Sequence, residues 1–444
     1  MGLPCRCPCR QMEKLYQYLW KSRMFGRHLR AEDGEDVLVI DPGKLNTDSG
    51  PDFFNSKVRI GDTEWAGNVE IHVKASDWYR HRHQDDPAYD NVILHVVGVS
   101  DRKIVRPDGR KIPQVTVALP EDFFRTYATL STPGADVRCA AFLPRLSSLE
   151  MTDWLESLAV ERIQKKGERV LATHRECGAD WEQTAFVTLA RGLGFGLNGE
   201  PFEMLARSIP LRILHHHSDN PLQLQALLFG QASMLDSSLH IFDEYYQLLC
   251  REYFFLARKY GLRPMRPGLW KYARTRPQNF PHRRIALLAR ACEGGFSLFS
   301  ALKEGIGDER RLREAFGWKL GGYWHSHFSF DVEARAVSDA LSQASVTLLL
   351  INVAAPIVYA AGAMRGDSDM AEKALDLLSS LPAEANGIIR MWSQLGVNAR
   401  DALRTQALIH LRKEYCDARK CLYCRFGHQA LRKSALSADG FRPI

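Results

Sequence analysis

Acidic, imidazole and indole side chains gather in one stretch, GPDFFNSKVRIGDTEWAGNVEIHVKASDWYRHRH, which spans residues 50–83. Within it AGNVEIHVK alternates, and alternation is typical of a strand whose side chains point to opposite faces in turn. Glu70, His72 and Lys74 therefore share one face. Asp52 precedes a strand-like segment, SKVRIG, so we expect a hairpin to bring it beside Glu70. This pair of carboxylates predicts a magnesium or manganese site at which His72 or Lys74 orients the attacking water.

Histidines in the same region favour a different metal. His81 and His83 have an HxH spacing that can present two imidazoles to one ion, and His72 and His95 lie nearby in the sequence. Imidazole ligands suit zinc, iron or nickel better than magnesium. His95 lies inside the apolar run VILHVV, where a hydrogen-bonded core histidine is the alternative to a ligand. For His81 and His83 the alternative is a pair of solvated loop residues.

A cysteine cluster near the C-terminus has the spacing CxxxxCxxCxxxH. Cys416, Cys421 and Cys424 are candidate ligands of one metal ion, because two residues between thiolates let both sulfurs reach it. The fourth ligand is either His428 or Cys139. Zinc fits either choice, whereas an iron-sulfur cluster fits better with Cys139. Such a site is expected to be structural, and reduced thiols without a metal are the alternative.

A short basic stretch, WKYARTRPQNFPHRR, interleaves cations with aromatic residues. That combination can hold phosphates and stack on bases, so it predicts a nucleic-acid-binding surface. The alternative is an ordered connector whose arginines brace helices. The candidate cations are Lys271, Arg274, Arg276, Arg283 and Arg284.

The sequence that positions these groups has two kinds of periodicity, one in each part of the chain. A helical pattern at residues 12–25 is followed by the strand-like segments DVLVID, AGNVEIHVK, NVILHVVGV and PQVTVAL, and from about residue 145 helical periodicity dominates. We therefore expect an α+β or α/β domain with a mixed sheet and then a large all-helical region. The expected divisions are a disordered tail or upstream extension at 1–11, a mixed domain at 12–125, a helical domain at 140–405 and a Cys-rich metal-binding tail at 406–444.

Composition is that of a soluble globular protein, with 45% hydrophobic and 25% charged residues among 444. The net charge of +7 is compatible with a nucleic-acid partner. The longest apolar run, SVTLLLINVAAPIVYAAGA, is interrupted by Asn352 and Pro356 and predicts a buried helix pair rather than a membrane span. With no signal-peptide pattern, a cytoplasmic location is expected. Phosphate-loop, nucleophile-elbow, HExxH and dinucleotide-binding motifs are absent from the sequence.

Two resemblances add to this interpretation. PDF at 51–53 and EIH at 70–72 resemble the PD-(D/E)XK nuclease arrangement, which implies a restriction-endonuclease-like sheet with Asp52 and Glu70 as metal ligands. The same resemblance makes Glu13 the acidic residue of the first helix and puts His72 where lysine is usual, with Lys74 as a replacement. The motifs GPDF, GNVEIH, SDW, HxH, VILHVV, RPQNFPHRR and YCxxxxCxxC resemble the bacterial family called domain of unknown function 2851, over nearly the whole chain.

Three functional hypotheses follow from the sequence. The leading one is a metal-dependent nuclease that uses magnesium or manganese at Asp52 and Glu70. The second is a nucleic-acid-binding or scaffolding subunit of the same fold whose site has lost activity, as the absent lysine suggests. The third is a transition-metal enzyme with His72, His81, His83 and His95 as candidate ligands and a small substrate. The oligomeric state and any nucleotide preference stay open.

Overall fold

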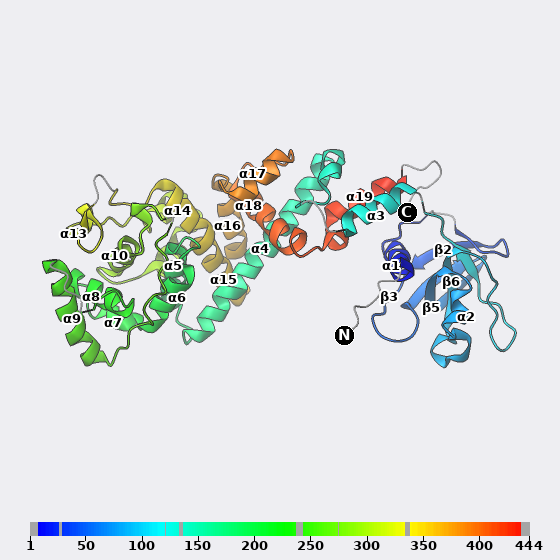
Figure 1. Ribbon diagram of the computed structural model, residues 1–444, viewed down its shortest axis with the longest axis horizontal. Coiled ribbons are helices and arrows are strands. Elements are labelled where there is room, and N and C mark those ends of the chain that lie inside the picture. The colour runs from blue at the N-terminus through cyan, green and yellow to red at the C-terminus, as the bar shows by residue number, and fades with distance from the viewer. Residues whose placement is uncertain are drawn as a thin grey trace. The chain divides into compact units, whose positions relative to one another are not determined.

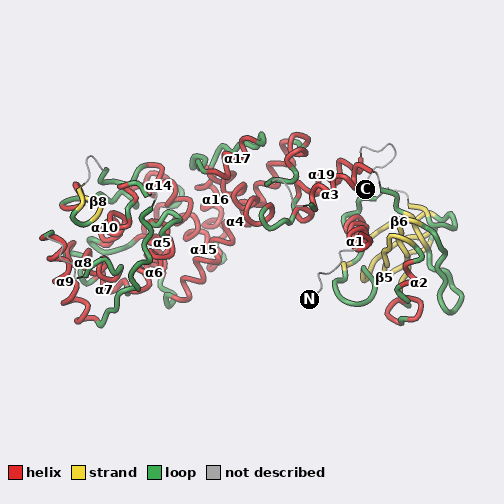
Figure 2. Tube along the Cα trace, viewed as in Figure 1, coloured by secondary structure: helices red, strands yellow, loops and turns green. Residues whose placement is uncertain are grey.

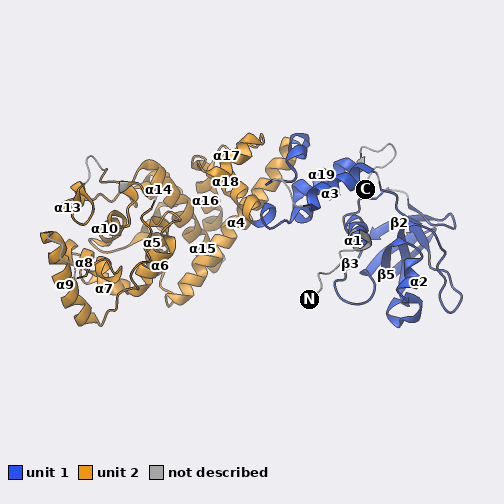
Figure 3. Cartoon of the chain, viewed as in Figure 1, with its two compact units in different colours: residues 1–147, 414–444 blue, residues 148–413 orange. Residues whose placement is uncertain are grey.

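A computed structural model of the chain describes residues 8–25, 29–119, 121–132, 136–236, 243–273, 275–333 and 338–436. The chain divides into two compact units (Figures 1 and 3). Unit 1 comprises residues 1–147 together with 414–444, and unit 2 comprises residues 148–413. Compared with the expected divisions, unit 1 extends past residue 125 and also includes most of the predicted C-terminal tail. Strands gather in unit 1, whereas unit 2 is almost entirely helical (Figure 2).

Unit 1 is built on a seven-stranded mixed sheet in the order β1-β2-β4-β5-β6-β7, with β3 paired to β4. The strands β2, β4 and β5 form an antiparallel meander, and β6 and β7 continue parallel to β5. A bridge between Ala31 and Val115 joins the two ends, so the sheet nearly closes into a barrel. The strands are β1 (Leu29–Arg30), β2 (Asp36–Asp41), β3 (Lys44–Leu45), β4 (Phe53–Ile60), β5 (Thr63–Lys74), β6 (Val92–Val99) and β7 (Gln114–Thr116).

The predicted strands of this sheet are confirmed, with shorter ends at β7. In β5, Glu70 and His72 are buried on one face while Val69 and Ile71 are buried on the other. The continuous apolar run at 92–99 forms β6, which lies between two parallel neighbours as such runs do. Both faces of β5 are thus covered where its polar residues lie, so these side chains need partners inside the protein.

Helices complete unit 1 at both ends of its sequence. Helix α1 (Pro8–Lys21) packs against β5, beginning before the predicted start; residues 1–7 of the predicted tail lie outside the described residues. Between β5 and β6 the chain makes only the short helix α2 (Asp77–Arg80) and two single turns. Helix α3 (Glu121–Ser131) packs against α19 (Arg425–Leu436).

Unit 2 is a helical domain around one large apolar core, as predicted, with a small β8–β9 hairpin that the sequence pattern did not reveal. Its main elements are α4 (Ser148–Glu176), α5 (Trp181–Leu193), α6 (Gly199–Ser208), α7 (Leu211–His215), α8 (Pro221–Gln231), α9 (Glu244–Tyr260), α10 (Pro281–Cys292), α11 (Leu298–Gly305), α12 (Glu309–Glu314), α13 (Tyr323–Ser326), β8 (His327–Ser329), β9 (Val332–Glu333), α14 (Gln343–Leu349), α15 (Ala355–Arg365), α16 (Ser368–Ser380), α17 (Gly387–Gln394) and α18 (Ala402–His410).

The most apolar helical segment of unit 2 runs from Gln343 to Arg365. It is long and apolar enough to span a membrane, but 78% of its most apolar window is buried inside the protein. The expected pair of helices is instead one helical segment, because α14 continues through a π-helical turn at Leu350–Ala354 into α15. Pro356 lacks an N–H donor, and the wider turn before it keeps the helix continuous. The segment is a core element of this unit.

Candidate functional site

The two carboxylates predicted to meet do meet. Asp52 immediately precedes β4, and the pairing of Phe53 with Val69 sets it opposite Glu70. The backbone N–H of Asp52 donates to Glu70 Oε2 at 2.9 Å, and the backbone N–H of Ile71 donates to Asp52 Oδ2 at 3.2 Å. Each carboxylate is therefore fixed by the backbone of the strand that carries the other.

Helix α1 adds a third acid and an amide to this site. Gln17 Nε2 donates to Asp52 Oδ1 at 2.7 Å. Burial raises the pKa of Asp52 above its ordinary value, and the charges of Glu70 and Glu13 raise it further. Burial also raises the pKa of Glu70, with a contribution from Glu13. These three acids therefore lie close enough to repel one another.

Among the described residues, the ion-pair contacts of Asp52 and Glu70 are with imidazoles. Glu70 Oε1 lies 3.3 Å from His83 Nε2 and 3.5 Å from His72 Nε2. No described lysine or arginine pairs with Asp52 or Glu70. A divalent cation is the remaining kind of partner that would compensate buried carboxylates.

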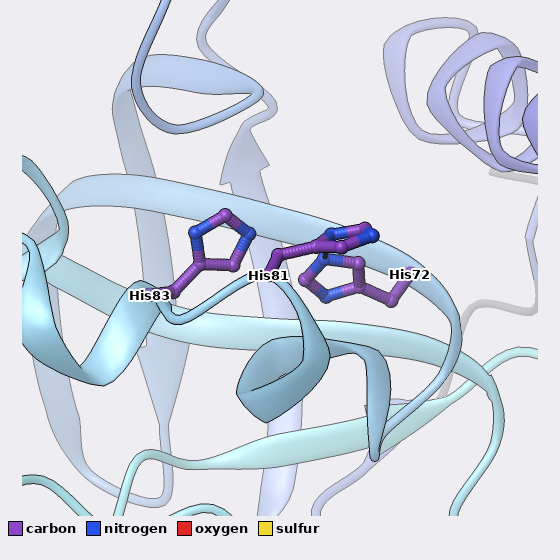
Figure 4. Close-up of side chains that lie close together, drawn as sticks. All are labelled: His72, His81 and His83. Carbon is purple, nitrogen blue, oxygen red and sulfur yellow. Dashed lines mark hydrogen bonds between the residues drawn. The ribbon is translucent and has the colours of Figure 1, made fainter.

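Three histidines meet in this region (Figure 4), and two of them contact Glu70. His72 comes from β5, whereas His81 and His83 come from the turn that follows α2. His72 Nε2 lies 3.2 Å from His81 Nδ1, and one ring nitrogen from each of the three lies within 4.8 Å of the other two. Burial lowers the pKa of all three imidazoles, and their mutual repulsion lowers it further for His72 and His81. Neutral imidazoles keep a lone pair, which is the form that binds metals.

His95 lies behind the three histidines rather than among them. Its Nε2 is 2.9 Å from His72 Nδ1, and its Nδ1 is 3.0 Å from Gln114 Oε1 on β7. Burial lowers the pKa of His95 to about 4, so the ring is neutral. It is thus a hydrogen-bonded core histidine that also contacts the site. Gln114 and Gln17 were not identified from the sequence, where a single glutamine carries no spacing signal.

Lys74 lies apart from these groups. Its side chain is exposed at the end of β5, and its charge contributes to the lowered pKa of Asp101. The strand alternation places it on the face of Glu70 and His72, but the strand leaves the covered part of the sheet there. Of the basic groups predicted for this face, His72 is the one in contact with Glu70.

The basic stretch of unit 2 is divided between interior and surface. Arg283 is 1% exposed and donates to the carbonyls of Trp324, His327 and Ser338. Arg284 is also buried, donates to Asn279 Oδ1 and lies 4.7 Å from the ring centre of Phe195. These two guanidinium groups brace the helical core, as expected if the stretch is an ordered connector rather than a nucleic-acid-binding surface. Lys271 and Arg276 are exposed, and Arg274 lies outside the described residues.

The predicted cysteine ligands all lie in unit 1. Burial raises the pKa of the Cys139 thiol, and the charges of Cys424, Cys416 and Cys421 raise it further. Burial also raises the pKa of the Cys421 thiol, although the charge of Arg138 and its hydrogen bond oppose this effect. His428 Nδ1 lies 3.1 Å from Tyr18 Oη. Among the described residues, His72, His81 and His83 form a group of ligand atoms close enough to hold one ion, and these cysteines do not.

Comparison with known proteins gives a family without an assigned activity. The family described as protein of unknown function (DUF2851) matches residues 13–387. No curated protein and no solved structure matches the chain.

Proposed function

Because the chain belongs to the DUF2851 family of proteins of unknown function, its activity has to be argued from its site, and we propose metal-dependent hydrolysis of a nucleic-acid phosphodiester. The observation that carries the proposal is the juxtaposition of Asp52 and Glu70. Both are held by backbone N–H groups, and no described lysine or arginine pairs with either. A divalent ion bound there lowers the pKa of a bound water and neutralises charge on the phosphodiester under attack.

The order of elements around the acids supports this proposal. A helix carrying Glu13 is followed by an antiparallel meander and then by a strand parallel to its last member. Asp52 comes from the start of the second meander strand and Glu70 from the third, which is the placement that the nuclease resemblance implies. The net charge of +7 suits a polyanionic substrate.

The cleavage assay uses the full-length protein with magnesium or manganese on single-stranded, double-stranded and branched DNA and RNA. We expect metal-dependent cleavage that falls more than about a hundredfold in Asp52→Ala. Asp48→Ala is the matched control, because Asp48 is an exposed carboxylate in the same loop. If the parent protein cleaves none of these substrates, the proposal is wrong. Salt-dependent nucleic-acid binding that is insensitive to Asp52→Ala would then favour the inactive binding subunit.

We propose in addition a structural metal, zinc or an iron-sulfur cluster, at Cys139, Cys416, Cys421 and Cys424. It is supported by the CxxxxCxxC spacing of the last three and by the presence of all four cysteines in unit 1. Cys421→Ser is expected to remove this metal and to lower the melting temperature, whereas Cys250→Ser, a half-buried cysteine of unit 2, leaves both unchanged. Equal metal content in Cys421→Ser and the parent would exclude this site.

A further inference from the structure

We propose that Glu70, His72, His81 and His83 bind one transition-metal ion of the zinc class, and that His95 and Gln114 set the tautomer of His72 for this purpose. Any reaction at this ion rests on the proposed function, whereas the metal site itself rests on the positions of these side chains. The site takes a transition metal, unlike the magnesium or manganese site expected from the carboxylates alone. It also makes His95 a positioning residue rather than a ligand.

The distances between the four donor atoms fit a tetrahedral ion. Glu70 Oε1 lies 3.3 Å from His83 Nε2 and 3.5 Å from His72 Nε2, and His72 Nε2 lies 3.2 Å from His81 Nδ1. Ligands about 2.1 Å from a tetrahedral zinc ion are roughly 3.4 Å apart. These three separations match edges of such a tetrahedron, and one ring nitrogen from each of the three histidines lies within 4.8 Å of the other two.

Two of the donor nitrogens offer a lone pair, and the third is freed by loss of a proton. His83 Nε2 is buried and makes no hydrogen bond among the described residues, although the Glu70 carboxylate lies beside it. His72 Nε2 and His81 Nδ1 are joined by a hydrogen bond (Figure 4), and Arg80 Nη2 lies 3.4 Å from His81 Nε2, so an ion bound here replaces the proton on His81 Nδ1. A set of three imidazoles and one carboxylate is typical of zinc, iron or nickel, and magnesium binds it poorly.

A chain of hydrogen bonds fixes which nitrogen of His72 faces the ion. Gln114 Nε2 donates to Glu32 Oε1 and Ser100 Oγ, so Gln114 Oε1 is the atom that accepts from His95 Nδ1–H. His95 Nε2 is then unprotonated and accepts from His72 Nδ1–H, which leaves the lone pair of His72 on Nε2. Metal-binding histidines commonly donate their other N–H in this manner, and the partner orients the ring.

The two oxygens of Glu70 have different partners. Oε1 faces the histidines, whereas Oε2 accepts from the backbone N–H of Asp52. Asp52 therefore orients the ligand carboxylate through its backbone. Its own Oδ1 and Oδ2 accept one hydrogen bond each, from Gln17 and from the backbone of Ile71, and each keeps a second lone pair. His81 is the exposed member of the set, and water and substrate reach the ion from its side.

The test measures zinc and cobalt(II) binding by the full-length chain. Metal is removed with a chelator, and each ion is titrated back in competition with a chromophoric chelator. Apart from metal held by the cysteines, which Cys421→Ser removes, we expect one equivalent per chain whose affinity falls more than about a hundredfold in His81→Ala and His83→Ala. His216→Ala is the matched control, an exposed histidine of unit 2, and it leaves the affinity unchanged. His81 is exposed, so its variant keeps the fold, which far-ultraviolet circular dichroism checks.

The positioning role of His95 has a separate readout. His95→Phe removes the acceptor for His72 Nδ1–H, so the affinity is expected to fall about ten- to hundredfold with a change in the cobalt(II) absorption spectrum. His95→Gln keeps an acceptor and is expected to restore part of both. If His95→Phe and His95→Gln bind cobalt(II) as the parent does, the positioning role is wrong.

The outcomes separate this inference from the proposed function. Metal binding that depends on His81 and His83, without cleavage of any nucleic acid, contradicts the proposed function and supports the metal site. Magnesium-dependent cleavage that persists in His81→Ala and His83→Ala supports the proposed function and shows that the reaction does not use an ion bound by the histidines. Zinc and cobalt(II) affinities that are the same in these variants and in the parent would overturn the metal site.

Discussion

At the scale of single residues, Glu70 is the point at which the acidic pair and the histidines meet. One oxygen is held by the backbone of Asp52, and the other faces His72 and His83. The carboxylate is buried, so its charge has a high free-energy cost without a cation beside it. The charge of Glu70 should therefore strengthen metal binding but lower the free energy of unfolding of the metal-free protein.

Glu70→Gln tests this opposition. The amide keeps an oxygen for the Asp52 N–H but removes the negative charge, so metal binding should be lost. The metal-free variant is expected to be more stable than the metal-free parent by on the order of 1 kcal/mol. Thermal unfolding with and without metal measures both effects. Glu64→Gln, at an exposed position of the same strand, is the control. A metal-free variant that melts below the parent contradicts the argument.

His282 of unit 2 gives a prediction for acid stability. It is packed against Phe229, Trp324 and Phe330, and burial lowers its pKa from 6.5 to about 4. Above pH 6.5 neither the folded nor the unfolded state binds the proton. As pH falls below 6.5, the unfolded state binds it first, so the free energy of unfolding decreases, by about 2 kcal/mol at pH 5.

His282→Phe should remove this part of the acid sensitivity. The measurement is denaturant unfolding of the parent and the variant at pH 7 and pH 5. From pH 7 to pH 5, the free energy of unfolding of the parent should fall by about 2 kcal/mol more than that of the variant. A constant difference would show that His282 takes up its proton without unfolding.

The buried arginines of the basic stretch predict a contrast between neighbours in sequence. Arg283→Ala leaves the carbonyls of Trp324, His327 and Ser338 without their donor and is expected to lower the free energy of unfolding by about 3 kcal/mol or more. Arg276→Ala, at an exposed site, should change it by less than about 0.5 kcal/mol. Chemical denaturation measures both. Equal effects would mean that Arg283 does not brace the core.

At the scale of elements, the packing of α1 on the sheet controls the site, because α1 carries Glu13 and Gln17. A Cβ added to Gly98 on β6 would lie 2.3 Å from Tyr16 Oη, far inside contact distance. Gly98→Ala must therefore displace the Tyr16 ring from a buried position. We expect a loss of about 2 kcal/mol in stability together with weaker metal binding.

Tyr16→Ala provides the check on this explanation. If the clash with Tyr16 is the cause, the double variant should lose at least about 1 kcal/mol less than the sum of the two single variants. A double-mutant cycle from denaturant unfolding measures the coupling. Additive losses would mean that Gly98 is needed for a reason other than the Tyr16 ring.

The sequence predicted elements with regular periods and local pairings well. Strand alternation and a continuous apolar run identified β5 and β6, and a hairpin places Asp52 beside Glu70 within a short separation along the chain. The HxH spacing suggested that His81 and His83 could join His72 at one ion, but the path that returns them was not predictable, because the segment after β5 forms short turns without a period. Charge also failed to predict exposure at Arg283, whose partners are carbonyls from distant parts of the chain.

At the scale of the whole molecule, unit 2 is a continuous segment with its own core, whereas unit 1 is assembled from both ends of the chain. A fragment of residues 148–413 should therefore fold alone, with a cooperative thermal transition followed by circular dichroism. It should bind no metal at the histidine site. A fragment of residues 1–147 should lack such a transition, because α19 buries Phe426 and Leu431 within unit 1.

Adding a peptide of residues 414–444 to the 1–147 fragment is the complementary test. It should restore a cooperative transition, since α19 packs on α3 and His428 reaches Tyr18 of α1. A fragment of residues 1–147 that unfolds cooperatively without the peptide would show that α19 is dispensable for this unit.

The split construction of unit 1 also affects how the protein is made. During translation α3 emerges with the rest of residues 1–147, but its partner α19 follows only after all of unit 2 has left the ribosome. At ordinary elongation rates this interval is roughly 15 to 50 s. For that time the nascent α3 exposes the surface that α19 later covers, and chaperones can bind this surface until synthesis ends.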